Sequence, residues 1–226
     1  MAQKVDIAWV NANTRFTDFS LIFCDMDSTF IQEECIDEIA AQCGFKSQVT
    51  AMTQETMAGN IDFASALCQR VALLKGLPES ALDAVYKNCI TLTPGAKNLV
   101  DMAHQHGIRF MLLSGGFSYF AQRLKQDYQL DAVFANELKI RNGQLTGSVK
   151  HPIIDGQAKA NLLIKVSQSL GLSLQQVIAI GDGANDILML QNAGVGIAFH
   201  AKPQVVQAAR YALQYSNLDA VRWLFQ

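Results

Sequence analysis

The sequence predicts an α/β protein: a doubly wound, mostly parallel sheet with a small helical cap inserted after the first strand. Three observations predict this class. Short apolar runs alternate with helical segments over most of the chain, which is typical of a parallel sheet covered by helices on both faces. A block of helical periodicity interrupts this alternation between the first and second runs. Three of the runs also stop at polar or glycine-rich loops, as buried strands do.

The first strand is expected at residues 19–24, where an apolar run stops at Asp25. Helical periodicity follows from Glu34 to about Asn88 and indicates roughly four helices without a strand. One of them spans residues 62–75. We therefore expect residues 34–90 to form the cap, and residues 1–33 and 91–226 to form the α/β catalytic core.

After the cap, strands and helices alternate again. A hairpin is expected around Asn142-Gly143, a pair that favours the tight turn between two antiparallel strands. The other strands are expected at 108–113, 132–135, 177–180 and 195–197, and the helices between Pro94 and Gly107 and at 118–126, 157–170 and 185–193.

Composition excludes several function classes. The net charge is −2 and no basic run is present, so the chain has no signature of nucleic-acid or anionic-membrane binding. The first residues lack the pattern of a signal peptide, and no apolar run reaches the ~20 residues of a membrane helix. The spacing of the five cysteines fits neither a disulfide framework nor a zinc site, and we expect small buried thiols. These features predict a soluble cytoplasmic protein of undetermined oligomeric state.

Candidate chemistry lies where three predicted strands end. In open parallel sheets, ligands bind outside the carboxyl ends of the strands, so these loops are expected to converge. Their residues are Asp25-Met26-Asp27-Ser28-Thr29, Ser114-Gly115-Gly116, and Gly181-Asp182-Gly183-Ala184-Asn185-Asp186.

Convergence of these loops would crowd the carboxylates of Asp25, Asp27, Asp182 and Asp186 into one crevice. Like charges at that range need neutralising, and a hard divalent cation with oxygen ligands, Mg²⁺, is the natural answer. Lys159 would add a point charge that holds phosphate. Taken singly, each piece has a structural reading as well: Asp-x-Asp and Gly-Asp-Gly occur in ordinary turns, and a lone lysine is usually solvated. The argument therefore depends on their coincidence at strand ends.

These motifs, with Lys159, resemble the four motifs of the haloacid dehalogenase superfamily, and more closely its phosphoserine phosphatase family. The resemblance covers residues of about 20 to about 212. It includes the segments 25–37, 57–63, 70–76, 92–96, 114–124, 134–138 and 198–203.

The resemblance implies hydrolysis of O-phospho-L-serine, the last step of serine biosynthesis, through a phosphorylated aspartate. Asp25 would be the nucleophile and Asp27 the general acid and base. Mg²⁺ would be held by Asp25, Asp182 and the backbone carbonyl of Asp27, with Asp186 in support. Ser114, Gly115, Lys159 and Asn185 would bind the phosphoryl group. Glu34 would bind the substrate ammonium and Arg70 its carboxylate, while Met57, Phe63 and Gly116 would line the remainder of the substrate site.

Three other functions stay open at this point. A phosphotransferase would use the same residues and pass the phosphoryl group to another alcohol, such as homoserine. A phospho-acceptor signalling domain also uses strand-end aspartates, a Ser or Thr and a lysine, but the predicted cap and Asp27 argue against it. An inactive binding module would be expected to have lost a motif position, and none is lost. The four histidines are given no catalytic role.

Overall fold

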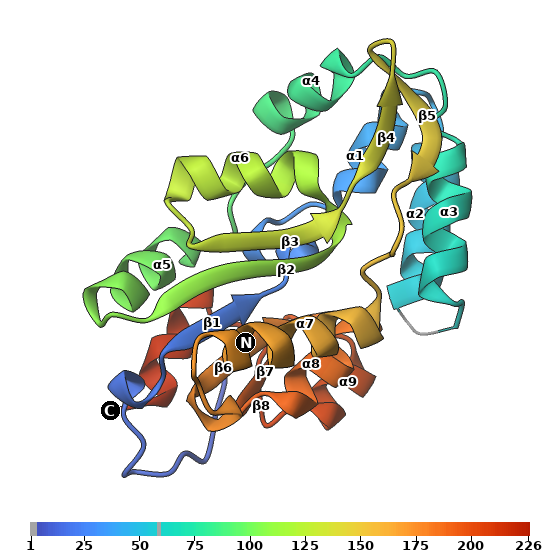
Figure 1. Ribbon diagram of the computed structural model, residues 1–226. Coiled ribbons are helices and arrows are strands. Elements are labelled where there is room, and N and C mark those ends of the chain that lie inside the picture. Colours follow the sequence, from blue (N-terminus) through green and yellow to red (C-terminus); the bar gives the residue numbers. More distant parts are fainter. Residues whose placement is uncertain (1–3, 58–59) are drawn as a thin grey trace.

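The computed structural model describes residues 4–57 and 60–226, without the side chain of Met57. Its centre is a sheet in the strand order β3-β2-β1-β6-β7-β8, in which every neighbouring pair is parallel. The predicted α/β class with a parallel sheet is confirmed (Figure 1). The strands are β1 (Leu21–Cys24), β2 (Arg109–Phe117), β3 (Ala132–Asn136), β6 (Val177–Gly181), β7 (Val195–Phe199) and β8 (Tyr211–Leu213).

Helices cover both faces of the sheet because alternate residues of each strand point to opposite sides. Ile22 and Cys24 of β1 belong to the core beneath α5 (Ala96–Gln105) and α6 (Ser118–Tyr128). Leu21 and Phe23 belong to the core on the other face. That second core is covered by α7 (Gly156–Ser169), α8 (Ile187–Asn192) and α9 (Pro203–Ala208). The β1 strand is thus buried on both sides, as its unbroken apolar run predicts.

The segment of residues 34–90, which follows β1, is helical, as expected. Its helices are α1 (Cys35–Ala41), α2 (Lys46–Met57), α3 (Phe63–Ala72) and α4 (Ser80–Asn88). Helix α4 is joined to α6 of the core by an ion pair between Asp83 and Arg123 at 2.9 Å.

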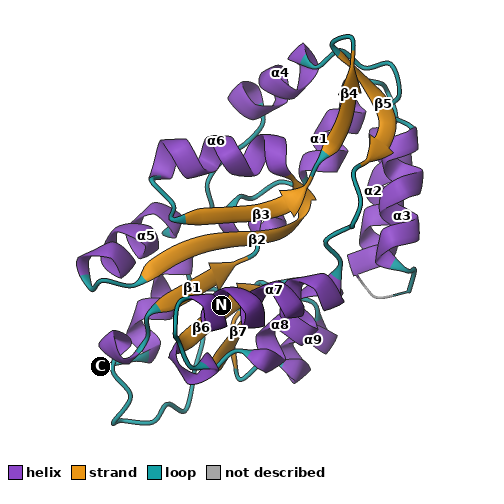
Figure 2. Cartoon of the chain, viewed as in Figure 1, coloured by secondary structure: helices purple, strands orange, loops and turns teal. Residues whose placement is uncertain are grey.

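The predicted hairpin consists of β4 (Leu138–Arg141) and β5 (Gln144–Val149). Figure 2 shows it beyond the end of β3, where β5 lies beside α3, and it forms a two-stranded sheet separate from the main one. Three backbone hydrogen bonds tie it to the connection between α3 and α4. They run from Gly76 N–H to the Leu145 carbonyl, from Leu145 N–H to the Leu77 carbonyl and from Glu79 N–H to the Gly143 carbonyl. The hairpin is therefore attached to the helical segment, although its sequence position groups it with the core.

Some expectations were wrong in detail. Ser114-Gly115-Gly116 was expected in a loop but lies inside β2, which continues past Leu113 through a register irregularity and pairs again at Phe117. The prediction also ended too early, because β8 and α9 follow the last expected strand. Cys24 and Cys35 are buried as expected, but Cys43 and Cys89 are only half-buried and Cys68 is exposed, so the expectation of buried thiols fails at these three. No described helix is both long and apolar enough to cross a membrane.

Candidate active site

The site lies where the strand order reverses. From β1 the chain proceeds to β2 and β3 on one side, while β6, β7 and β8 extend the sheet on the other. Asp25 directly follows β1 and Asp182 directly follows β6, and these strands are neighbours. The Asp25 N–H donates to the Ile180 carbonyl at 2.9 Å and continues the ladder beyond the strand end. Two aspartates far apart in sequence are thereby held side by side.

Asp25 opens a single wide helical turn, Met26–Phe30. Its Oδ1 accepts the N–H of Met26 at 2.7 Å, and its carbonyl accepts the N–H of Phe30 at 3.2 Å. Within this turn Asp27 keeps an extended conformation, with φ −67° and ψ 136°. The carboxylates of Asp25 and Asp27 both line one cavity, in agreement with their spacing of two residues.

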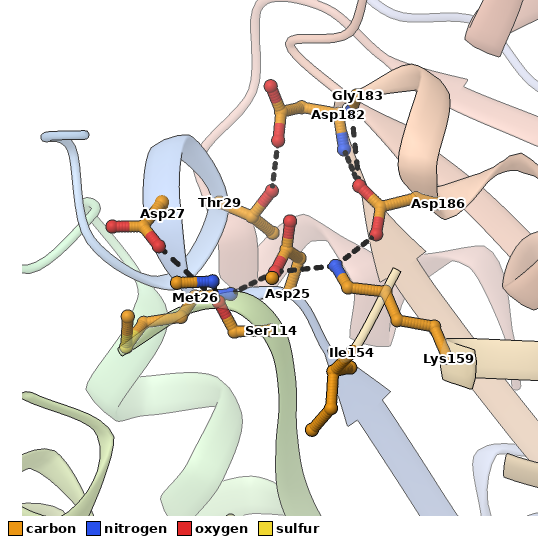
Figure 3. A network of polar contacts seen from close by, with 12 residues as sticks. Asp25, Met26, Asp27, Thr29, Ser114, Ile154, Lys159, Asp182, Gly183 and Asp186 are labelled. Carbon is orange, nitrogen blue, oxygen red and sulfur yellow. Dashed lines mark hydrogen bonds and ion pairs between the residues drawn. The ribbon is translucent and has the colours of Figure 1, made fainter. Parts of the chain in front are cut away.

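Lys159 is fully buried, and the reading of a solvated lysine is wrong. It lies in the first turn of α7, where Asp155 caps the helix by accepting the N–H of Ala158. Its Nζ lies 2.8 Å from Asp25 Oδ1 and 2.6 Å from Asp186 Oδ1, as Figure 3 shows. Burial opposes the charge of Lys159, but the two carboxylates outweigh that effect and raise its pKa.

Asp186 connects this lysine to the loop after β6. Its Oδ2 accepts the backbone N–H of Asp182 at 3.2 Å and of Gly183 at 3.1 Å. Asp182 in turn accepts a hydrogen bond from Thr29 Oγ1 at 3.1 Å. Asp25, Asp182 and Asp186 each offer a carboxylate oxygen, and these oxygens lie within 4.8 Å of one another. Three buried carboxylates at this range form a donor set that suits a hard divalent cation.

The pKa values of two of these carboxyl groups are raised by the protein environment. Burial raises the pKa of Asp25 well above its usual range, Asp186 raises it further, and Lys159 opposes both. Burial also raises the pKa of Asp182, assisted by the charges of Asp186 and Asp25. The single positive charge of Lys159 therefore does not neutralise the three carboxylates. A bound cation would neutralise the remaining negative charge.

The pKa of Asp27 is raised chiefly by burial. Asp27 Oδ1 accepts the N–H of Cys35 at 2.8 Å, and this bond lowers the pKa. Oδ2 accepts a longer hydrogen bond from Ser114 Oγ at 3.3 Å. Burial therefore favours the protonated form of this carboxyl.

The two glycines of β2 permit close packing at the cavity. A Cβ on Gly115 would lie 2.4 Å from Cζ of Phe63, and one on Gly116 would lie 2.0 Å from Asp27 Oδ2. Real Cβ contacts are never so short, so no other residue fits either position without displacement. Gly116 therefore lets β2 approach Asp27. The contact of Gly116 with the substrate, expected from the sequence, stays a prediction.

Asn185 lines the same cavity, and its Oδ1 is buried without a hydrogen-bond partner among the described residues. Buried polar atoms are normally partnered, so this oxygen is available to a ligand or water.

The predicted specificity residues line the same cavity. Glu34 precedes α1 and accepts a hydrogen bond from Ser28 Oγ at 2.6 Å. Arg70 of α3 is buried and lines the cavity with Glu34 and Phe63. Burial raises the pKa of Glu34 to about 8, and the charge of Asp27 adds to the shift. The side chain of Met57 lies outside the described residues.

The cavity has a volume of about 30 Å³, room for one or two water molecules. The residues around it combine the carboxylate of Asp25, the carboxyl of Asp27 with its raised pKa, hydroxyl and amide groups, and a separate acid–base pair in Glu34 and Arg70. This set suits transfer of a phosphoryl group from a small zwitterionic ester.

Sequence reasoning missed several supporting residues. Asn136 is buried at the end of β3, where its amide donates to the Gly115 carbonyl at 2.8 Å and its Oδ1 accepts the Ile154 N–H at 2.7 Å. It thus joins β2 to the segment before α7. Thr29 and Ser28 were named only as parts of a motif. A polar residue directly after an apolar strand was the available signal for Asn136.

Comparison with known proteins agrees with this geometry. The family model described as haloacid dehalogenase-like hydrolase matches residues 22–191. A phosphoserine phosphatase of Archaeoglobus fulgidus is 44% identical over 95% of this chain and 62% of its own length. Another, from Polaromonas sp., is 43% identical over 91% of this chain and 89% of its own. A solved phospho-aspartyl intermediate analogue of phosphoserine phosphatase superposes with a TM-score of 0.87, at 36% identity, over 91% of this chain and 98% of that one.

Proposed function

Since the chain belongs to the haloacid dehalogenase-like hydrolases, we propose that it hydrolyses O-phospho-L-serine to L-serine and phosphate through an aspartyl phosphate on Asp25. One observation carries the proposal: Glu34 and Arg70 line the same cavity as Asp25 and Asp27. One small substrate can thereby contact both the groups that transfer its phosphoryl group and the groups that bind its ammonium and its carboxylate. We expect this reaction to be the last step of serine biosynthesis and the protein to act in the cytoplasm.

Asp25 attacks phosphorus as the bond to the serine oxygen breaks. Its Oδ1 is held by Met26 and Lys159, which leaves Oδ2 without a protein partner among the described residues and open to react. Asp27 gives its proton to the departing serine oxygen. It then takes a proton from the water that attacks the phosphorylated Asp25, which releases phosphate and restores both carboxyl groups.

The transferred phosphoryl oxygens are bound by Ser114 Oγ, the Gly115 N–H, Lys159 and Asn185. Lys159 has three N–H donors, and its two carboxylate partners leave one donor for the phosphoryl group. These donors stabilise the charge that spreads over the equatorial oxygens in the transition state.

Asp25, Asp182 and the backbone carbonyl of Asp27 would hold Mg²⁺, and Asp186 supports them by fixing the loop after β6. When bound, Mg²⁺ supplies positive charge that keeps the carboxylates ionised and polarises the phosphoryl group.

Glu34 is proposed to bind the substrate ammonium and Arg70 the carboxylate, with Phe63, Met57 and Gly116 completing the pocket. Residues 34–90 would act as a cap on a core of residues 1–33 and 91–226. The cavity is small, about 30 Å³, so we expect the cap to move when phosphoserine binds.

The test is phosphate release from phosphoserine, phosphoethanolamine and p-nitrophenyl phosphate with Mg²⁺ present. Phosphoserine should have the highest kcat/KM, because phosphoethanolamine lacks the carboxylate and p-nitrophenyl phosphate lacks both charged groups. Equal rates for phosphoserine and phosphoethanolamine would refute the substrate assignment. Added homoserine should not divert phosphate to a new ester. If it did, the phosphotransferase alternative would replace the hydrolase.

A further inference from the structure

Three buried polar side chains, one from each of three cap helices, form a continuous chain behind the cavity. They are Asp37 of α1, Thr53 of α2 and Arg70 of α3, exposed to 7%, 3% and 3%. Thr53 Oγ1 lies 2.8 Å from Asp37 Oδ1 and 2.9 Å from Arg70 Nη1. Only Arg70 of the three lines the cavity. The other two therefore act on a ligand only through Arg70.

The direction of each hydrogen bond is fixed by chemistry. A guanidinium only donates and a carboxylate only accepts, so the Thr53 hydroxyl accepts from Arg70 and donates its one proton onward. That proton goes to Asp37 or to the Val49 carbonyl, 3.0 Å away. The hydroxyl lone pair is thereby directed at Arg70.

The partners of Arg70 leave its charge available. Its Nε donates to the Ala66 carbonyl at 3.2 Å and its Nη1 to Thr53, and both acceptors are uncharged. A guanidinium has five N–H donors, so the remaining ones can bind a carboxylate in the forked geometry that arginine favours. Holding the side chain in place beforehand reduces the freedom that it loses when substrate binds.

We propose that Thr53, backed by Asp37, is a positioning residue that sets substrate specificity by aiming Arg70 at the carboxylate of the substrate. This inference rests on the proposed function, in which Arg70 receives that carboxylate. Neither Thr53 nor Asp37 takes part in the phosphoryl transfer itself.

Thr53→Val tests the proposal because valine keeps the shape and removes the hydroxyl. Thr53→Ser keeps the hydroxyl. The matched control is Thr56→Val on the same helix. Thr56 is also buried and donates to the carbonyl four residues earlier, that of Met52, at 2.7 Å. Each variant is assayed as the full-length enzyme with phosphoserine and with phosphoethanolamine, which differ by the carboxylate alone.

We expect Thr53→Val to lower kcat/KM for phosphoserine about tenfold, mainly through KM, as loss of a hydrogen bond to a charged group does. Its kcat/KM for phosphoethanolamine should stay at the wild-type value. Thr53→Ser should restore the preference for phosphoserine, and Thr56→Val should leave it unchanged. Asp37→Asn keeps an acceptor for Thr53 and should weaken the preference less than Thr53→Val.

Two results would overturn the inference: an equal loss on both substrates in Thr53→Val, or a wild-type preference retained in that variant. If Thr53→Val does not fold, failure of Thr53→Ser to retain the preference overturns it as well. A wild-type enzyme without any preference for phosphoserine would instead remove the proposed function, and this inference with it. Wild-type behaviour therefore separates the two failures.

Discussion

At the scale of single residues, Lys159 determines which carboxylates of the site can be neutralised by mutation without loss of the fold. It is fully buried, and two carboxylates, of Asp25 and Asp186, offset the loss of its hydration. Removing both would leave an unpaired buried charge, which is strongly destabilising. Removing one leaves the ion pair with the other. Asp25 can therefore be neutralised without loss of the fold.

Asp25→Asn should abolish phosphate release, by at least ~10³-fold, because a neutral amide is a poor nucleophile. The variant should melt close to wild type, since Lys159 keeps Asp186 at 2.6 Å. Phosphate release and a thermal melt on the same preparation check both statements. Substantial turnover by a well-folded variant would show that another group is the nucleophile.

Glu34 should give substrate recognition a pH dependence. Burial raises its pKa to about 8, so in the free enzyme it is mostly protonated at pH 7 and becomes charged as the pH rises. The ratio of kcat/KM for phosphoserine to that for p-nitrophenyl phosphate should therefore increase between pH 6.5 and 8.5, because only an ionised Glu34 pairs with the ammonium. Glu34→Gln should flatten this profile. A ratio that is flat in wild type, or that still rises in the variant, would argue against this role.

At the scale of elements, β2 brings its backbone unusually close to the reacting groups. Gly115 faces the ring of Phe63 and Gly116 faces Asp27, so neighbouring positions of one strand lie against α3 and against the proposed general acid respectively. The side-chain amide of Asn136 in β3 donates a hydrogen bond to the Gly115 carbonyl of the same strand. Its register irregularity after Leu113 is thus part of how the site is built.

Gly116→Ala should displace Asp27, because the added Cβ would lie 2.0 Å from its Oδ2. We expect a loss of ~10²-fold with phosphoserine, the usual contribution of a positioned general acid. The loss should be smaller with p-nitrophenyl phosphate, whose leaving group needs less protonation. Single-turnover formation of the phosphoenzyme measures this step directly.

Gly115→Ala is the matched comparison, because its Cβ would meet the ring of Phe63 instead of a carboxyl. It should raise KM without favouring either leaving group. Identical behaviour of the two variants would mean that both merely distort β2.

At the scale of the whole molecule, the sheet gathers carboxylates that the chain alone cannot neutralise. The folded-state pKa values of Asp25 and Asp182 are raised. Their contribution to stability is therefore fully present only below about pH 4, near their unfolded pKa, and is lost as the pH rises through the folded-state pKa. A cation that competes with the bound protons should reverse this loss.

Mg²⁺ should accordingly raise the Tm above that in EDTA, and by more at pH 8 than at pH 5.5. Asp182→Asn should remove most of this increase, because it deletes one of the three clustered carboxylates. Asp101→Asn, on the exposed surface of α5, is the control and should keep it. Activity should vanish in EDTA and return with Mg²⁺. Full activity after exhaustive chelation, or a Tm that ignores Mg²⁺, would contradict the metal site.

The α/β class, the order of the elements up to β7 and the groups at the strand ends can all be predicted from the sequence. Those features are local, because an apolar run that stops at Asp25 or Gly181 can be recognised without knowledge of the segments that pack against it. Only the tertiary structure decided what surrounds each group. It placed Lys159 in full burial between two carboxylates, extended β2 through its glycines, and joined Asp37, Thr53 and Arg70 across three helices. Burial and contacts between distant segments set these properties, and residue type alone specifies neither.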